Sequence, residues 1–168
     1  MKLMKVIFLD IDGVCNCSST TDRLGQYIGI DQDKVDLLKY IVDKTDAYIV
    51  VSSTWRHYKE FMDYLEKRLG EDLWKRYLGK TIEKLSSSRY NEIDAWLHEN
   101  EVENFIVIDD DHIDSLCHFD KHFIQTQYED GLTKEIADVC ILKLNEVCQD
   151  ECMKYYQGKH RGTHVEPT

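Results

Sequence analysis

Three apolar runs of the sequence each end in polar side chains that could bind a cation or a phosphate. These side chains are Asp10 and Asp12, Ser52 and Ser53, and Asp109, Asp110 and Asp111. Side chains of a strand alternate between its two sides, so Asp10 and Asp12 would point the same way. Because two carboxylates on one side repel each other, the pair indicates a bound cation or a reaction at this place.

The chemistry that fits these residue types is phosphoryl transfer. Hard oxygen ligands favour Mg²⁺, which readily bridges to a phosphate. Beside such a cation, Asp10 could attack phosphorus and form an aspartyl-phosphate. Asp12 could protonate the leaving oxygen and later deprotonate the attacking water. A serine hydroxyl and a lysine or arginine would complete the contacts to the phosphoryl group.

The apolar periodicity predicts strands that alternate with helices. We expect strands at 5–11, 47–53, 104–111 and 122–126, and helices at 31–45, 55–70, 71–77, 89–100 and 132–147. Gly70 would end the helix that precedes it. The alternation predicts an α/β fold with a parallel sheet between layers of helices. Because ligands bind at the carboxyl ends of such strands, the three polar endings should form one site.

Length and charge narrow the class of protein. The chain has 168 residues, enough for one domain with a buried core. We expect this domain over residues 1–148, followed by a polar, loosely held tail at 149–168. The net charge of −11 disfavours non-specific binding to a polyanion. No apolar run approaches the roughly 20 residues that span a bilayer, and the N-terminus shows no signal-peptide pattern, so we expect a cytoplasmic protein without a membrane partner.

The six cysteines form no C-x-x-C pair. Without an export signal, we expect them to be reduced thiols. Cys140 lies in an apolar helical stretch and should be a small buried hydrophobe. Cys117, His118 and His122 lie close together in the sequence and stay open as a set of metal ligands.

Each motif alone is also typical of ordinary loops, turns and helix ends, and Arg56 and Arg89 alone would be surface residues. Together, FLDIDGV at 8–14, YIVVSSTWR at 48–56 and FIVIDDD at 105–111 resemble the haloacid dehalogenase (HAD) superfamily of phosphohydrolases. The resemblance covers roughly residues 5–133. It implies a Rossmann-like three-layer α/β/α sandwich with a central parallel sheet.

The resemblance also implies a role for each site residue. Asp10 would be the nucleophile and a ligand of Mg²⁺, and Asp12 the general acid and base, with its backbone carbonyl on the metal. Asp110 would reach the metal, while Asp109 would orient the metal or its water. Asp111 and Asp114 would more often begin a helix than bind the ion.

Two positions stay open within the resemblance. If the second strand ends at Val51, Ser52 is the phosphate ligand, whereas the family's spacing to the following tryptophan favours Ser53, which we prefer. The family's Lys or Arg before the last motif is assigned to Arg89, with Lys80 and Lys84 as alternatives.

A narrower resemblance concerns the substrate. STWR, R-x-x-E-I-x-x-W-L, I-D-D-D and G-L-T are similar to patterns in the HAD domains of RNA-repair and polynucleotide-end-processing proteins. This implies a nucleotide or a nucleic-acid end as the phosphorylated partner. A phosphoprotein phosphatase, a small-metabolite phosphatase and a catalytically silent binding module are the alternatives. The insertions at 15–30 and 70–88 are too short for a large cap domain, so the site should be open.

Overall fold

The computed structural model describes residues 3–83, 87–111 and 116–161. Five parallel strands form its central sheet in the order β5-β4-β1-β6-β7. Their bounds are β1 Met4–Leu9, β4 Tyr48–Val51, β5 Tyr77–Lys80, β6 Val102–Asp109 and β7 Phe123–Gln125. The strands β1, β4 and β6 lie in the middle of the sheet and carry the three motifs found in the sequence.

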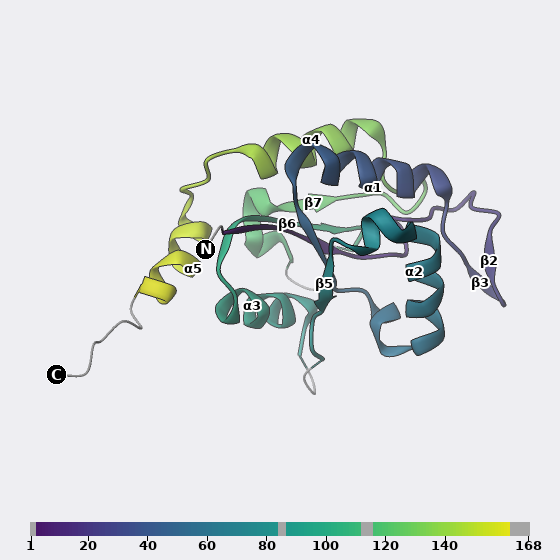
Figure 1. Cartoon of the computed structure of the whole chain (residues 1–168), viewed down its shortest axis with the longest axis horizontal. Coiled ribbons are helices and arrows are strands. Elements are labelled where there is room, and N and C mark those ends of the chain that lie inside the picture. Colours follow the sequence, from purple (N-terminus) through teal and green to yellow (C-terminus); the bar gives the residue numbers. More distant parts are fainter. Residues whose placement is uncertain (1–2, 84–86, 112–115, 162–168) are drawn as a thin grey trace.

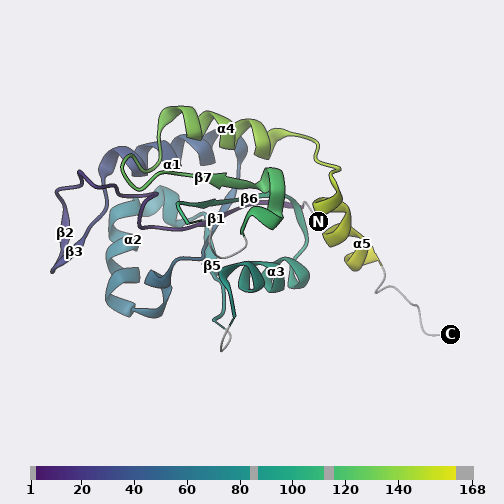
Figure 2. The ribbon, with the colours of Figure 1, turned by 180° about the vertical axis from the view of Figure 1, so that it is seen from behind.

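Helices cover both faces of this sheet. One face packs against α1 Gln32–Thr45, α2 Lys59–Trp74 and α4 Lys134–Asn145, and the other packs against α3 Arg89–Glu99, the 3-10 segment η2 Leu116–His122 and α5 Glu151–Arg161. Figures 1 and 2 show α1 and α4 on one side of the strands and α3 on the opposite side. The first core lies between the sheet and α1, α2 and α4, and the second core lies between the sheet and α3, η2 and α5. Along β1, Ile7 and Leu9 pack in the first core, while Val6 and Phe8 pack in the second. The three-layer α/β/α sandwich predicted from the sequence is confirmed.

The expected elements are found with shifted ends, and one strand was missed. The expected helix at 55–70 begins as the 3-10 turn η1 Thr54–His57, and α2 then continues past a break at Gly70, where φ is 79°. Residues 77–80 were not expected as a strand because YLGK contains no apolar run. They form β5 because the exposed edge of β4 supplies partners for their backbone groups.

No large cap domain is present among the described residues. The insertion at 15–30 contains a two-stranded hairpin, β2 Arg23–Leu24 and β3 Tyr27–Ile28. Figure 1 shows this hairpin beyond α2, at one end of the molecule. The insertion at 70–88 holds the end of α2 and β5.

The expectation of a loosely held tail is wrong for residues 151–161. They form α5, whose Met153 and Tyr156 are buried in the second core. The phenol of Tyr156 donates a hydrogen bond of 2.6 Å to Asp94 on α3. Two apolar residues three positions apart suffice to dock one face of a mostly polar helix. The division of the chain at residue 148 stays a prediction.

Two further observations concern the expected class of protein. No described helix is long and apolar enough to cross a membrane. The cysteines whose side chains are described carry free thiols: Cys15, Cys17, Cys140, Cys148 and Cys152. Cys140 is fully buried in the first core, as predicted.

Candidate active site

The carboxyl ends of the three central strands bring the predicted residues to one edge of the sheet. In the parallel register, Leu9 pairs with Val51 on one side and with Ile108 on the other. These three residues face the first core. Because side chains alternate, the next residue of each strand points to the opposite face, where α3 begins. These next residues are Asp10, Ser52 and Asp109.

Three carboxylates gather at this edge. Oxygens of Asp10, Asp109 and Asp110 lie within 4.8 Å of one another. Asp10 is 5% exposed and Asp109 is fully buried. Loss of solvation raises the pKa of all three carboxyl groups, and for Asp10 the charge of Asp109 raises the pKa further. Three of the four predicted metal residues therefore form one group whose ionised state a cation would stabilise.

Arg89 lies where the sequence predicted a cation. It begins α3, and its Nη1 contacts Asp109 and lies 3.6 Å from Oδ1 of Asp10. The guanidinium is held between two carboxylates and points toward the edge that carries the motifs. The alternative Lys80 instead donates to the backbone carbonyl of Arg56 at 2.8 Å. Lys84 and Asp114 lie outside the described residues.

Asp12 lies apart from the carboxylate group, with each oxygen held by a neutral donor. Asn16 Nδ2 donates to Oδ1 at 2.9 Å, and Trp55 Nε1 donates to Oδ2 at 3.0 Å. Both donors are buried, whereas Asp12 is exposed. The carboxylate is thus fixed in direction while it remains accessible to a substrate. Sequence reasoning did not assign these two positioning residues, although Trp55 belongs to the STWR pattern.

Gly13 allows Asp110 to approach the loop after β1. Its φ is +75°, and a Cβ at this position would lie 2.5 Å from Cγ of Asp110 and 2.8 Å from its Cβ. The Gly13 carbonyl accepts a 2.6 Å hydrogen bond from Thr126, and its N–H donates to Asn16 at 2.9 Å. The glycine is therefore required for its backbone conformation and for the space it leaves.

The two candidate serines differ in their contacts. Ser53 caps η1, since its Oγ accepts a 3.2 Å hydrogen bond from the Trp55 N–H. The strand β4 ends at Val51, and the buried Oγ of Ser52 has no hydrogen-bond partner among the described residues. Buried hydroxyls usually have a partner, which a phosphoryl oxygen could supply here. These contacts favour Ser52 over our preferred Ser53, and the choice stays a prediction.

Arg56 and Arg89 are not the surface residues that each alone suggested. Arg56 is 4% exposed, and its Nη1 donates to the carbonyls of Ser52 and Ser53 at 2.9 and 2.8 Å. Its Nη2 forms a 2.6 Å ion pair with Glu92 of α3. Arg56 therefore fixes the serine turn to the helix that carries Arg89.

A family model described as "HAD domain in Swiss Army Knife RNA repair proteins" matches residues 6–137. The chain belongs to this family. The matched range includes every residue of the HAD site described above, and the family places the chain among HAD-type hydrolases. Members of the HAD superfamily generally use Mg²⁺, which agrees with the acidic group at the sheet edge. No curated protein and no solved structure matches the chain.

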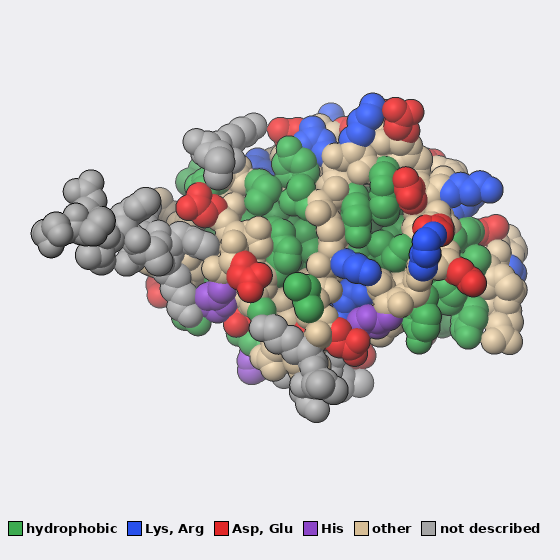
Figure 3. Space-filling model, turned by 60° about the horizontal axis from the view of Figure 1, so that its bottom comes forward, with side chains coloured by type: hydrophobic (Ala, Val, Ile, Leu, Met, Phe, Trp, Pro, Cys, Tyr) green, Lys and Arg blue, Asp and Glu red, His purple; other side chains and the backbone are tan. Residues whose placement is uncertain are grey.

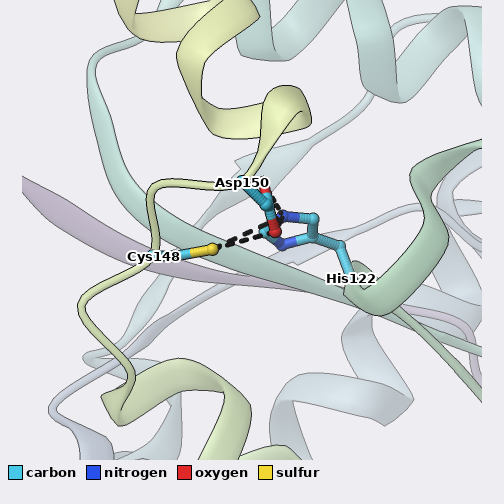
Figure 4. Close-up of side chains that lie close together, drawn as sticks. All are labelled: His122, Cys148 and Asp150. Carbon is cyan, nitrogen blue, oxygen red and sulfur yellow. Dashed lines mark hydrogen bonds and ion pairs between the residues drawn. The ribbon is translucent and has the colours of Figure 1, made fainter.

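A second group of possible metal ligands lies outside the HAD motifs, at the start of α5 (Figure 4). His122 Nε2 and Cys148 Sγ each lie 2.9 Å from Oδ2 of Asp150. The ammonium of Lys143 also contacts this oxygen, at 3.2 Å. Because the chain's own lysine already neutralises the carboxylate, we interpret the group as a polar anchor for the segment before α5.

This anchor corrects the sequence interpretation of the His and Cys residues. His122 pairs with Asp150, whereas His118 is exposed and its ring lies 5.7 Å from that of Tyr90. The two histidines therefore do not share a site, and the side chain of Cys117 lies outside the described residues. A local motif search could not find this group, because Cys148 and Asp150 lie 26 and 28 positions from His122.

Proposed function

We propose that the chain is a Mg²⁺-dependent phosphomonoester hydrolase that works through an aspartyl-phosphate on Asp10. The observation that carries this proposal is the convergence of Asp10, Asp109 and Asp110 beside Arg89, with Asp12 held separately at the accessible side. A binding module without chemistry would not need two differently held aspartates two positions apart. The free thiols and the absence of a spanning helix among the described residues support a cytoplasmic location.

The donor set fits Mg²⁺. Its oxygens come from carboxylates, and burial opposes their ionised state, so a hard divalent cation has both ligands and a charge to balance. Asp10, Asp110 and the Asp12 carbonyl would hold the ion, and Asp109 would orient it or its water. When bound, Mg²⁺ would neutralise charge on the phosphoryl group and on Asp10.

The side chains then divide the reaction into two steps. Asp10 attacks phosphorus while the ester P–O bond breaks, and Asp12 gives its proton to the leaving oxygen. In the second step, Asp12 takes a proton from water as that water attacks phosphorus, and the bond to Asp10 breaks to release phosphate. Arg89 and the hydroxyl of Ser52 or Ser53 would contact the phosphoryl oxygens throughout.

The substrate we propose is a phosphate on a nucleotide or a nucleic-acid end. The family description supports it, as does the open site without a large cap. A phosphoprotein or small-metabolite substrate is the alternative, and a panel of phosphorylated oligonucleotides, nucleotides, sugar phosphates and phosphopeptides separates them by kcat/KM.

The proposal is tested by hydrolysis of an aryl phosphate with and without Mg²⁺ in wild type and Asp10→Asn. An amide cannot attack phosphorus, so the variant should keep the fold and less than about a hundredth of the rate. Asp111→Asn is the matched control, since Asp111 lies beside the site and its side chain is not in the carboxylate group. Retained turnover in Asp10→Asn would exclude Asp10 as the nucleophile.

A further inference from the structure

A cavity of about 900 Å³ opens beside Asp12. Its wall is formed by the hairpin β2–β3, the turn η1 with the start of α2, and the loop after β7. Five aromatic side chains from these segments line it: Tyr27, Trp55, Tyr58, Phe61 and Tyr128. The cavity is therefore continuous with the active site, and its lining is largely aromatic.

Four of these five rings form one cluster around Phe61. The ring of Phe61 lies 5.2 Å from that of Tyr27, 5.4 Å from that of Tyr58 and 5.0 Å from that of Trp55. Tyr27 and Tyr58 are 52% and 59% exposed. Exposed aromatic surface in a cavity is typical of a ligand site, because stacking on a flat partner would remove it from water.

The position of Asp12 identifies which part of a substrate would enter. This step rests on the proposed function, in which Asp12 protonates the leaving oxygen. The same carboxylate lines the cavity, and the Trp55 ring that holds it forms part of the aromatic wall. The group attached to the leaving oxygen should therefore lie against the aromatic rings, while the phosphoryl group lies over Asp10.

The charges of the lining do not form a basic track for a phosphate backbone. Its basic residues, His57 and Lys59, each lie beside an acid: Nδ1 of His57 lies 3.4 Å from Glu83, and Nζ of Lys59 lies 2.5 Å from Asp63. On the face drawn in Figure 3, Lys and Arg side chains are interspersed with Asp and Glu. Affinity for a polyanion rests on clustered basic side chains, whereas this lining offers mainly aromatic rings, which favours recognition by stacking.

We propose that this cavity binds the nucleobase of the nucleotide that carries the scissile phosphate, by stacking on Tyr27 and Tyr58. The substrate is then recognised through a single unpaired nucleotide, either free or at the end of a strand. The cavity volume of about 900 Å³ lies in the range of sites that hold drug-sized ligands, so a base and its ribose have room in it. A phosphotyrosyl ring would instead leave most of the space unfilled.

The first test compares kcat/KM for a nucleoside monophosphate and for glycerol phosphate. Wild type should prefer the nucleotide, and Tyr58→Ala and Tyr27→Ala should each lower kcat/KM for it by about tenfold or more, the range for loss of a stacking ring, without changing that for glycerol phosphate. Tyr58→Phe keeps the ring and should retain the preference. Tyr155→Ala is the matched control, because Tyr155 is 51% exposed on α5, away from the cavity.

A second test separates the two sources of the nucleotide. A single-stranded oligonucleotide and a mononucleotide with the same phosphate should give kcat/KM values within about threefold, with a shallow dependence on salt. A strong preference for the oligonucleotide with steep salt dependence would overturn recognition of a single nucleotide. Equal use of glycerol phosphate, or a preference for a phosphotyrosyl peptide, would overturn base stacking.

Binding distinguishes failure of this inference from failure of the proposed function. If wild type hydrolyses none of these compounds, the proposed hydrolase function is wrong. Equilibrium dialysis with the same nucleoside monophosphate then tests the nucleobase site by itself. Binding that Tyr58→Ala weakens and Tyr155→Ala does not would still support the nucleobase site. Absence of binding would overturn it.

Discussion

Replacement of Gly13 by alanine tests how closely the loop after β1 and Asp110 must approach. The new Cβ would lie 2.5 Å from Cγ of Asp110, while ordinary contacts between such atoms are about 3.5 Å. Asp110 or the loop must therefore move by about 1 Å. In addition, a non-glycine residue at φ +75° costs about 1–2 kcal/mol.

The expected result is a loss of stability together with a larger loss of activity. The backbone strain alone would lower Tm by about 2–8 °C in a chain of this size. If Asp110 holds the metal ion as we propose, a displacement of about 1 Å there can lower the rate by about a hundredfold. Mg²⁺ should raise the Tm of wild type by mass action, and Gly13→Ala should weaken this response. Thermal melting during a Mg²⁺ titration and hydrolysis of an aryl phosphate measure the three quantities.

Gly70→Ala is the matched control. Gly70 has a φ of +79°, and a Cβ there would meet nothing within 4 Å. It should show the strain without the collision, and so lose stability while it keeps its activity and its response to Mg²⁺. If Gly13→Ala behaves in the same way as Gly70→Ala, the close approach to Asp110 does not matter for the site, and our reasoning is refuted.

Further predictions concern the carboxylate group, the two serines after β4 and the polar anchor before α5. Asp110→Ala should abolish the rise of Tm with Mg²⁺ yet leave the metal-free Tm equal or higher, because burial raises the pKa of this carboxyl and its charge opposes folding. Asp111→Ala should keep the response to Mg²⁺. The reverse outcome would move the metal-ligand assignment from Asp110 to Asp111. Ser52→Ala should raise KM more than Ser53→Ala in steady-state assays, while Ser53→Ala should lower Tm through loss of a helix cap. A larger kinetic effect at position 53 would instead favour Ser53 as the phosphate ligand. Burial raises the pKa of Asp150, but hydrogen bonds from Cys148, Met153 and His122 outweigh this effect and hold the pKa below its ordinary value of 3.8. The ionised carboxylate therefore stabilises the fold above that pH, and the stabilisation is lost progressively below it. The Tm difference between wild type and Asp150→Asn should shrink as the pH falls from 6 to 3, and a constant difference would contradict this.

The strands and their polar ends could be predicted from the sequence because both depend on local pattern. An apolar run predicts a buried strand, and the parallel topology places the next residues at one edge, which locates Asp10, Ser52 and Asp109 together. Arg89 could be placed because it begins the helix before β6. Strand alternation gives the direction of Asp10, Ser52 and Asp109, but it does not place Asp12, which lies beyond the end of β1 and apart from the carboxylate group.

The contacts that hold the site could not be predicted in this way. Trp55 reaches Asp12 across 43 positions, and no local pattern marks an indole as a hydrogen-bond donor to one particular carboxylate. The strand β5 depends on an open edge of β4, which exists only in the assembled sheet. Likewise, α5 is held by the buried Met153 and Tyr156 and by the contact of Asp150 with His122, which lies 28 positions earlier in the sequence.

The ion pair of Arg56 and Glu92 has a consequence for how the sequence can change over time. Both side chains are almost fully buried, so replacement of either one alone would leave an uncompensated charge, at a cost of about 3–5 kcal/mol. This is a large part of the roughly 5–15 kcal/mol that stabilises a typical domain. Substitution of both by neutral side chains of similar size avoids that cost. Two positions 36 residues apart, neither of them in the carboxylate group, should therefore vary together among descendants of this chain.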